Sequence, residues 1–234
     1  MIHKKCVAII QARLNSSRLP LKGLLCLKEN PIIDWVITRI SKSTKLDQII
    51  VALPDTKIDN ILANHLEQKG INYIQGPEDD VLSRFILASK KTNADLIIRI
   101  CADNPLIWHV AIDRLIDFYQ NNKCDYSYNH IPKNNLWPDG LGAEIISRDL
   151  LEEIHLKAKE QNEREHCLNY IWHNNSKYCI KTFDPIEKWL CRPDLKLDID
   201  TKEDFVFLSE KAININMDAK EIITAFDFNN NIDY

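Results

Sequence analysis

Three cations and two hydroxyls are concentrated in the segment QARLNSSRLPLK, residues 11–22. Arg13, Arg18 and Lys22 supply fixed positive charge and hydrogen-bond donors, and Ser16 and the serine after it add hydroxyls. A polyphosphate is bound by groups of this kind. The segment has too few glycines for a dinucleotide-binding turn or a P-loop. A solvated basic loop has the same residue types, so the segment alone leaves both interpretations open.

Carboxylates after two other apolar runs could complete a phosphate site. Asp103 follows the run LIIRI, and the alternating segment LKLDID places Asp198 and Asp200 on one face of an expected strand, opposite Leu197 and Ile199. Two like charges side by side are unfavourable unless a cation compensates them. Carboxylates and substrate phosphates together are typical Mg²⁺ ligands. Asp200 could instead cap a helix, because DTKED is also a capping-box sequence.

The alternation of apolar runs and helical segments indicates what positions these groups. The expected strands are 7–11, 48–53, 72–75 and 96–100, and amphipathic helices are expected in PIIDWVITRISKS and IDNILANHLEQKG. This pattern predicts an α/β fold with a mostly parallel central sheet and helices on both faces. Ligands bind at the carboxyl ends of strands in such sheets, which is where the basic segment and Asp103 begin.

The alternation breaks near residue 130. The turn-rich IPKNNLWPDGLG follows DYSYNH, and AEIIS precedes the helical segments RDLLEEIHLKAKEQ and EREHCLNYIWHNN. A strand in KLDID and helices in KEDFVFLSEKA and MDAKEIITAFDF are expected to follow. We predict a single domain over residues 1–234, with a substrate-specific region around 126–175.

Composition excludes some partners. The formal net charge of -4 argues against a general nucleic-acid or membrane surface. Seven cysteines occur without a Cys-x-x-Cys pair, so neither a zinc site nor a disulfide framework is expected. The N-terminal apolar run turns polar at Gln11, too soon for a signal peptide. We expect a cytoplasmic protein, and a homodimer is compatible with the sequence.

Six motifs in order carry a family resemblance: VAIIQARLNSSRLPLKGL, GPEDDVLSRF, IIRICADNPLI, DYSYN, EREHCLNYI and LDIDTKEDF. Together they resemble the cytidylyltransferases of the spore-coat polysaccharide SpsF type, relatives of the CMP-3-deoxy-manno-octulosonate and CMP-acylneuraminate synthetases. The resemblance implies a nucleotide-diphospho-sugar transferase (Rossmann-like) fold. It also implies that CTP binds over the first loop and that a sugar hydroxyl attacks the α-phosphate, which releases pyrophosphate.

The resemblance also implies roles for individual residues. The expected catalytic residues are Lys22, Arg13 and Asp103. Mg²⁺ would be held by Asp103, Asp198 and Asp200. The nucleotide would contact Ala12, Arg13, Ser16, Arg18, Lys22 and Arg84, and the sugar would contact Tyr128, Asn129, Glu144 and His166.

Some of these residues have simpler explanations. Asp79 or Asp80 is expected to cap a helix that starts at Val81, which would make the GPEDDVLSRF motif structural. The charged run EREHC is also typical of a salt-bridged helix surface. Cys167 within it is expected in the core, because no base or oxyanion site accompanies it.

The substrate is less well defined than the reaction. The chain has CADNP and a short turn-rich segment where the sugar-acid synthetases have their own signatures, so we expect CMP activation of an acidic eight- or nine-carbon sugar or of another surface-polysaccharide precursor. Two other functions are compatible with the residues. One is a metal-dependent glycosyltransferase that uses a nucleotide sugar, and the other is a non-catalytic nucleotide-binding protein on the same fold.

Overall fold

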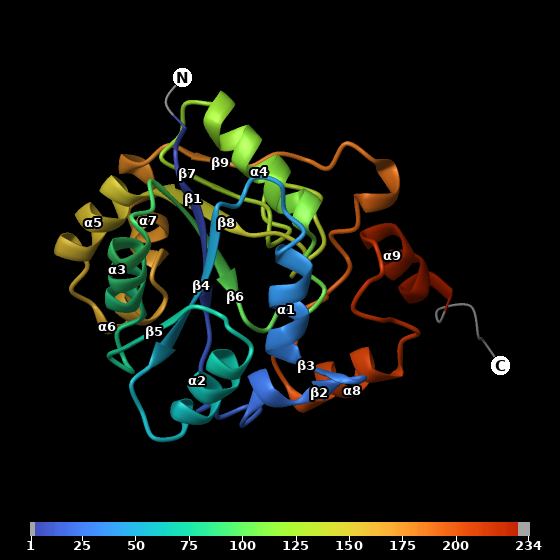
Figure 1. Ribbon diagram of the computed structural model, residues 1–234. Coiled ribbons are helices and arrows are strands. Elements are labelled where there is room, and N and C mark those ends of the chain that lie inside the picture. The colour runs from blue at the N-terminus through green and yellow to red at the C-terminus, as the bar shows by residue number, and fades with distance from the viewer. Residues whose placement is uncertain (1–2, 229–234) are drawn as a thin grey trace.

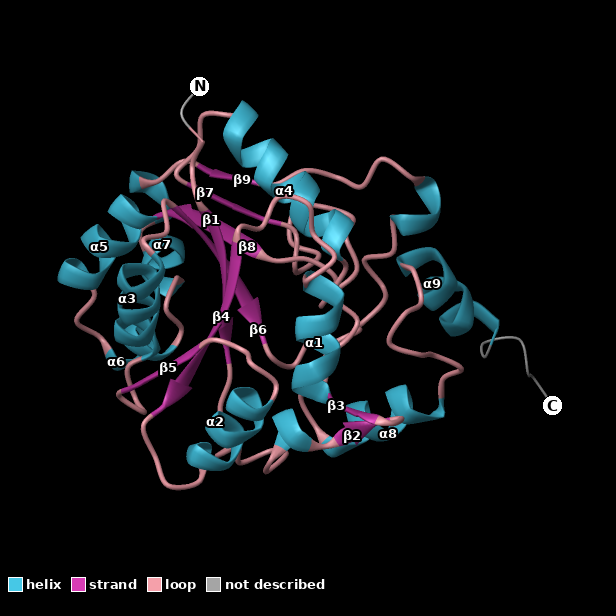
Figure 2. Ribbon diagram, in the orientation of Figure 1, coloured by secondary structure: helices cyan, strands magenta, loops and turns pink. Residues whose placement is uncertain are grey.

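A seven-stranded sheet forms the centre of the molecule in the computed structural model, which describes residues 3–228 (Figure 2). Its strand order is β5-β4-β1-β6-β8-β7-β9. The strands are β1 (Cys6–Gln11), β4 (Gln48–Pro54), β5 (Tyr73–Gly76), β6 (Leu96–Cys101), β7 (Tyr126–Tyr128), β8 (Glu144–Ser147) and β9 (Ile180–Lys181). β8 runs antiparallel to both of its neighbours, and the other pairings are parallel. The mostly parallel sheet is therefore confirmed, together with the four strands expected before residue 130.

Helices cover both faces of this sheet (Figure 1). The helices α1 (Ile32–Ile40), α2 (Asp59–Gln68) and α4 (His109–Asn121) pack on one face. The opposite face is covered by α3 (Val81–Thr92), α5 (Arg148–Lys157) and α7 (Asn169–His173), with the short α6 (Gln161–Glu165) beside them. The predicted α/β fold with two helical layers is confirmed.

Strand β1 illustrates why the sequence forms this arrangement. Val7 and Ile9 point into the α3 side of the core, whereas Ala8 and Ile10 point into the α1 side, and all four are fully buried. A strand covered on both faces has no polar alternation, which explains the continuous run CVAII. Each valine or isoleucine side chain contributes roughly 1.5–3 kcal/mol when it is fully buried, and the single methyl group of Ala8 contributes less.

The C-terminal part of the chain forms a third apolar cluster against α1 and α4. It contains α8 (Lys202–Glu210), α9 (Ala219–Phe228) and a small hairpin of β2 (Cys26–Leu27) and β3 (Asn30–Pro31). Arg39 on α1 is buried here and donates to the carbonyls of Ile107 and Met217. These contacts hold the segment before α9 against α1 and the segment before α4.

Two local expectations were wrong. KLDID does not join a strand ladder, since Lys196 makes only an isolated bridge to Asp139. Its alternation is nevertheless real, because Leu197 and Ile199 are buried in the third cluster. EREHCLNYIWHNN is not one helix either: α6 ends at Glu165, and α7 begins at Asn169.

Short elements complete the described chain. The 3₁₀ turns η1 (Lys22–Leu24), η2 (Asn175–Lys177) and η3 (Lys188–Leu190) lie in connecting segments. No helix within residues 3–228 has both the length and the apolar character needed to cross a membrane.

Candidate active site

A pocket of about 220 Å³ lies where the carboxyl ends of β1 and β6 meet. Gln11 and Cys101 are register partners at these ends, and the Ala102 N–H donates to the Gln11 carbonyl. The loop after β1, the end of β6 and His166 line the pocket. Position at adjacent strand ends explains why residues 90 positions apart in the sequence share one site.

The loop after β1 is anchored from beneath. The Leu14 side chain is fully buried, and its N–H donates to the buried carboxylate of Asp59 at 2.7 Å. Its carbonyl accepts the N–H of Leu21, and the Ser16 hydroxyl accepts the N–H of Leu19. Ala12, Leu14 and Leu19 are therefore buried, and the cations of the loop line the pocket.

These cations contact the carboxylates that the sequence singled out. Lys22 Nζ lies 2.9 Å from Asp103 Oδ2 and 3.7 Å from Asp200 Oδ1, and it donates to the Ile199 carbonyl at 2.7 Å. Arg18 contacts Asp200 at 3.1 Å, and Arg13 contacts Glu165 at 3.2 Å. The loop and the two acidic segments thus form one cluster.

Asp200 is not the helix cap that DTKED suggested. Thr201 caps α8 in a reciprocal capping box with Asp204, and the backbone N–H of Asp200 donates to Asp204 Oδ2. The Asp200 side chain therefore remains available to Arg18 and Lys22.

Asp198 lies beside a second acidic residue that the sequence did not indicate, Asp139. Burial, followed by the charge of Asp139, raises the pKa of Asp198 to about 7. Gly140, with a φ of 84°, permits this approach, because a Cβ there would lie 2.9 Å from the Asp198 nitrogen.

The carboxylates of Asp103, Asp198 and Asp200 are suitable ligands for a hard cation, although they do not converge on a single point. Asp198 Oδ1 is buried without a hydrogen-bond partner, and carboxylate oxygens are the ligands that Mg²⁺ prefers. Within residues 3–228, however, no three His, Cys, Asp or Glu side chains converge in a ligating arrangement. Lys22 lies between Asp103 and Asp200 and compensates their charge.

His166 reaches the pocket because the helical segment breaks there. It is exposed, lies just after the end of α6, and lines the pocket with Arg13 and Asp103. Arg164 instead turns inward, where it pairs with Asp80 and donates to the Ser83 hydroxyl. The EREHC run is thus neither a regular helix nor only a solvated ion-pair surface.

The other residues expected to contact the sugar are buried outside the pocket lining. Tyr128 donates to the Lys133 carbonyl and packs on Trp172. Asn129 donates to the Ala111 carbonyl and accepts the Ala143 N–H, which fastens the turn before β8. Both side chains therefore stabilise the segment between β7 and β8.

Glu144 is buried behind Arg99 and does not line the pocket itself. Its carboxylate accepts hydrogen bonds from Arg99 and Tyr126, and Arg99 itself lines the pocket.

Of the two remaining residues expected to bind the nucleotide, one lines the pocket and the other does not. Ala12 lines the pocket and is almost fully buried. Arg84 is buried outside the pocket lining and donates to the carbonyls of Pro77 and Glu78. Asp80 caps α3 by accepting the Ser83 N–H, which confirms the capping interpretation of its motif.

Five residues of the pocket lining were missed: Gln11, Gly23, Arg99, Cys101 and Ala102. A single arginine within the apolar run LIIRI was the available signal for Arg99, because a charge in a strand covered on both faces needs a specific partner. Cys167 nearby is fully buried, as expected, and burial raises the pKa of its thiol to about 11. All seven cysteines are free thiols within the described residues.

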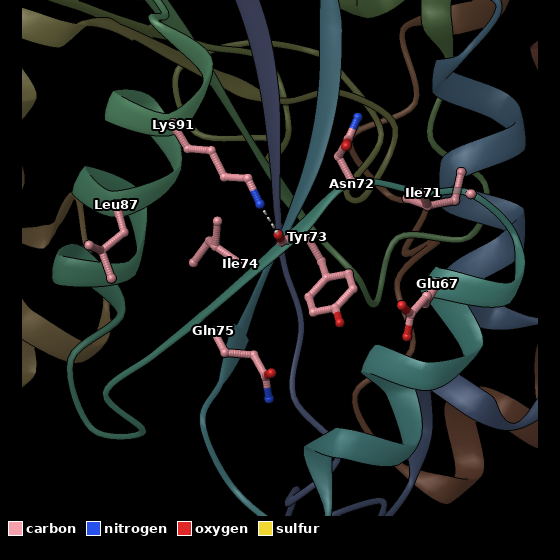
Figure 3. Close-up of a pocket in the computed structure, with 9 residues that line it drawn as sticks. Glu67, Ile71, Asn72, Tyr73, Ile74, Gln75, Leu87 and Lys91 are labelled. Carbon is pink, nitrogen blue, oxygen red and sulfur yellow. Dashed lines mark hydrogen bonds between the residues drawn. The ribbon is translucent and has the colours of Figure 1, made fainter.

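A wider, shallow hollow lies at the edge strand β5, between α2 and α3 (Figure 3). Ile74 and Leu87 contribute apolar surface there, and Lys91 donates to the Tyr73 carbonyl. None of the residues expected to bind nucleotide or sugar lines this hollow. The chemistry-bearing side chains are instead gathered at the carboxyl ends of β1 and β6.

The sheet is mostly parallel, and cations suited to bind phosphate gather at its carboxyl edge. This arrangement is typical of α/β nucleotidyltransferases. Residues 7–225 match the family model described as cytidylyltransferase. The chain therefore belongs to the cytidylyltransferase family, and it is a CTP-dependent nucleotidyltransferase.

Three relatives illustrate the match. An uncharacterized protein of Methanocaldococcus jannaschii is 38% identical over 96% of this chain and 91% of its own. The spore coat polysaccharide biosynthesis protein SpsF of Bacillus subtilis is 30% identical over 94% and 93%. A cytidylyltransferase structure from Leptospira borgpetersenii superposes with a TM-score of 0.87 at 26% identity, covering 97% of this chain and 96% of that one. The resemblance to the SpsF type is confirmed.

Proposed function

We propose that the protein transfers CMP from CTP to a hydroxyl of a sugar and releases pyrophosphate, for surface polysaccharide or glycoconjugate biosynthesis. The observation that carries the proposal is the position of Lys22, which joins the basic loop to Asp103 and Asp200 at the strand ends. A cation held there can stabilise negative charge on a transferring phosphoryl group.

The ion pairs of the loop indicate how CTP would enter. Arg13 and Arg18 are 46% and 61% exposed, and each contacts a carboxylate on another segment. Exposed pairs of this kind contribute about 0–1 kcal/mol, so phosphate oxygens can replace the carboxylates at little cost. The forked guanidinium of Arg13 would then hold two oxygens, while Lys22 would lie near the reacting phosphate.

A divalent cation would complete the charge balance. Asp103, Asp198 and Asp200 are the residues that would hold Mg²⁺, which supplies Lewis-acid neutralisation of the triphosphate when bound. The Oδ1 atom of Asp198, which is buried without a hydrogen-bond partner and 3.9 Å from Lys196 Nζ, supports this assignment.

The acceptor we propose is a sugar, with an acidic eight- or nine-carbon sugar as the first candidate. His166 is the expected sugar-binding side chain that opens to the pocket. It would donate to an oxygen of the acceptor, while the loop cations hold CTP.

A panel of four nucleotides and several sugars, with Mg²⁺ present or absent, tests this function. Pyrophosphate release with CTP and a sugar is expected only with Mg²⁺. Release of a nucleoside diphosphate from a nucleotide sugar would instead identify a glycosyltransferase. Binding of CTP without pyrophosphate release from any sugar would identify a nucleotide-binding protein.

A further inference from the structure

A buried ion pair supports one part of the pocket lining, where Arg99 faces the pocket and Glu144 lies behind it. Arg99 on β6 and Glu144 on β8 are register partners, and their side chains are 13% and 4% exposed. The second carboxylate oxygen of Glu144 accepts the Tyr126 hydroxyl. Gln11 accepts from Nε and Nη2 of Arg99 at 3.3 and 3.2 Å. Three strands thus fix the guanidinium in one orientation.

Arg99 retains donors that this network does not use. A guanidinium has five N–H groups, and three of them donate to Gln11 or Glu144. The other two hydrogen-bond no oxygen or nitrogen atom among residues 3–228, although the Cys167 thiol lies against the guanidinium. Arg99 lines the pocket together with Cys101 and Asp103. A ligand that fills the pocket would satisfy these donors.

The charge of Arg99 is already neutralised. Arg13 and Arg18 can release exposed carboxylates to water, but Arg99 cannot release Glu144 without leaving a buried carboxylate unpaired, which is strongly unfavourable. Arg99 therefore keeps Glu144 when a ligand binds. Its remaining N–H groups suit an uncharged oxygen better than a second anion.

We propose that Arg99 donates to a hydroxyl of the acceptor, and that Glu144 is a positioning residue that acts through Arg99. This inference rests on the proposed function. The exchangeable cations after β1 account for the triphosphate, whereas Arg99 adjoins β8 and the substrate-specific region. If the acceptor is a sugar acid, its carboxylate binds away from Arg99.

The test is a neutral double variant, Arg99→Met with Glu144→Gln. It leaves no unpaired buried charge, and the glutamine oxygen still accepts from the Tyr126 hydroxyl. With 3-deoxy-manno-octulosonate as the first acceptor probe, the KM for the acceptor is expected to rise roughly 10- to 100-fold, the loss typical of a hydrogen bond from a charged donor. The Kd for CTP, measured by calorimetry, is expected to change less than about twofold, because the loop cations remain.

Two further variants separate recognition from folding. Arg39→Met removes another buried arginine, one that donates to backbone carbonyls outside the pocket, and it should lower the melting temperature while the acceptor KM stays the same. Arg99→Lys keeps the charge without the fork, and it should also raise the acceptor KM.

An unchanged acceptor KM in the folded double variant would overturn the inference, as would a weakened Kd for CTP. Absence of pyrophosphate release by the wild-type protein from CTP and every sugar in the panel would instead refute the proposed function, and the inference with it.

Discussion

Two sets of ion pairs lie at the pocket, and they differ in whether their partners can be exchanged. The side chains of Arg13 and Arg18 on the loop after β1 are 46% and 61% exposed, whereas Arg99 and its partner Glu144 are buried. Breaking a pair of the first kind costs about 0–1 kcal/mol, and breaking a pair of the second kind costs about 3–5 kcal/mol. The loop can therefore bind and release a polyanion, while the buried pair keeps a fixed shape.

Lys22 is intermediate between the two sets, and its removal is expected to have the largest effect. Its side chain is only 14% exposed and contacts two carboxylates. Lys22→Ala should lower kcat by roughly two to four powers of ten, as for other preorganised charges that act on the reacting phosphate. Steady-state pyrophosphate release measures this loss. A near-normal kcat would place the loop outside the active site.

Arg13→Lys tests whether the exposed pairs are exchanged for phosphate. A lysine preserves the charge but loses the fork, so the KM for CTP should rise by roughly tenfold with a smaller change in kcat. The melting temperature without ligand should stay within about 1 °C, because the pair with Glu165 is exposed. If the KM for CTP is unchanged, Arg13 does not bind the triphosphate through its forked guanidinium.

The sequence predicted the cations of the loop after β1 far better than the buried pair of Arg99 and Glu144. Arg13, Arg18 and Lys22 lie within ten residues, and Asp103 directly follows a strand, so local spacing and strand polarity place them together. Arg99 and Glu144 meet only because β8 inserts antiparallel next to β6. That pairing depends on a long-range register that no local pattern specifies.

The same reason explains the errors in the acidic segment. The alternation in KLDID was read as a strand, but its buried leucine and isoleucine pack in the C-terminal cluster and form no ladder. Asp139 was missed because it approaches Asp198 from a separate turn. The β1-to-β6 half of the sheet was predictable because each parallel strand is a continuous apolar run.

A smaller effect should appear in the pH dependence of stability. It tests how rigid the surroundings of the buried Arg99–Glu144 pair are. Burial, together with the charge of Arg99, lowers the pKa of His130 to about 3, and its Nε2 lies 3.7 Å from Glu144. The folded state keeps this imidazole neutral, whereas the unfolded chain binds a proton below about pH 6.5. Its contribution to stability is therefore present above pH 6.5 and is lost as the pH falls from 6.5 toward 3.

His130→Gln removes this titration. The free energy of unfolding of the wild-type protein should fall more steeply between pH 6 and 4 than that of the variant, with a slope difference of up to about 1.4 kcal/mol per pH unit. Urea titrations at several pH values measure both slopes. Parallel slopes would show that His130 is solvated in the folded state, and these surroundings would then be less rigid than the ion pair indicates.

The smallest expected effect concerns the backbone that presents Lys22. Leu21 has a φ of 59° and a ψ of 17°, a left-handed conformation that costs a residue with a Cβ roughly 1–2 kcal/mol. Leu21→Gly relieves this strain but loses some apolar contact and adds chain entropy to the unfolded state. Leu21→Val keeps an apolar side chain and adds a β-branch, which is less tolerant of positive φ. The free energy of unfolding should therefore decrease in the order glycine, leucine, valine, with a spread of about 1–2 kcal/mol that urea denaturation can measure.

The KM for CTP of the glycine variant should stay within about twofold, because the ion pairs of Arg13 and Arg18 do not depend on the Leu21 side chain. A valine variant as stable as the wild type would mean that the loop relaxes out of the left-handed conformation, and Lys22 would then be held by its side-chain contacts with Asp103, Asp200 and the Ile199 carbonyl.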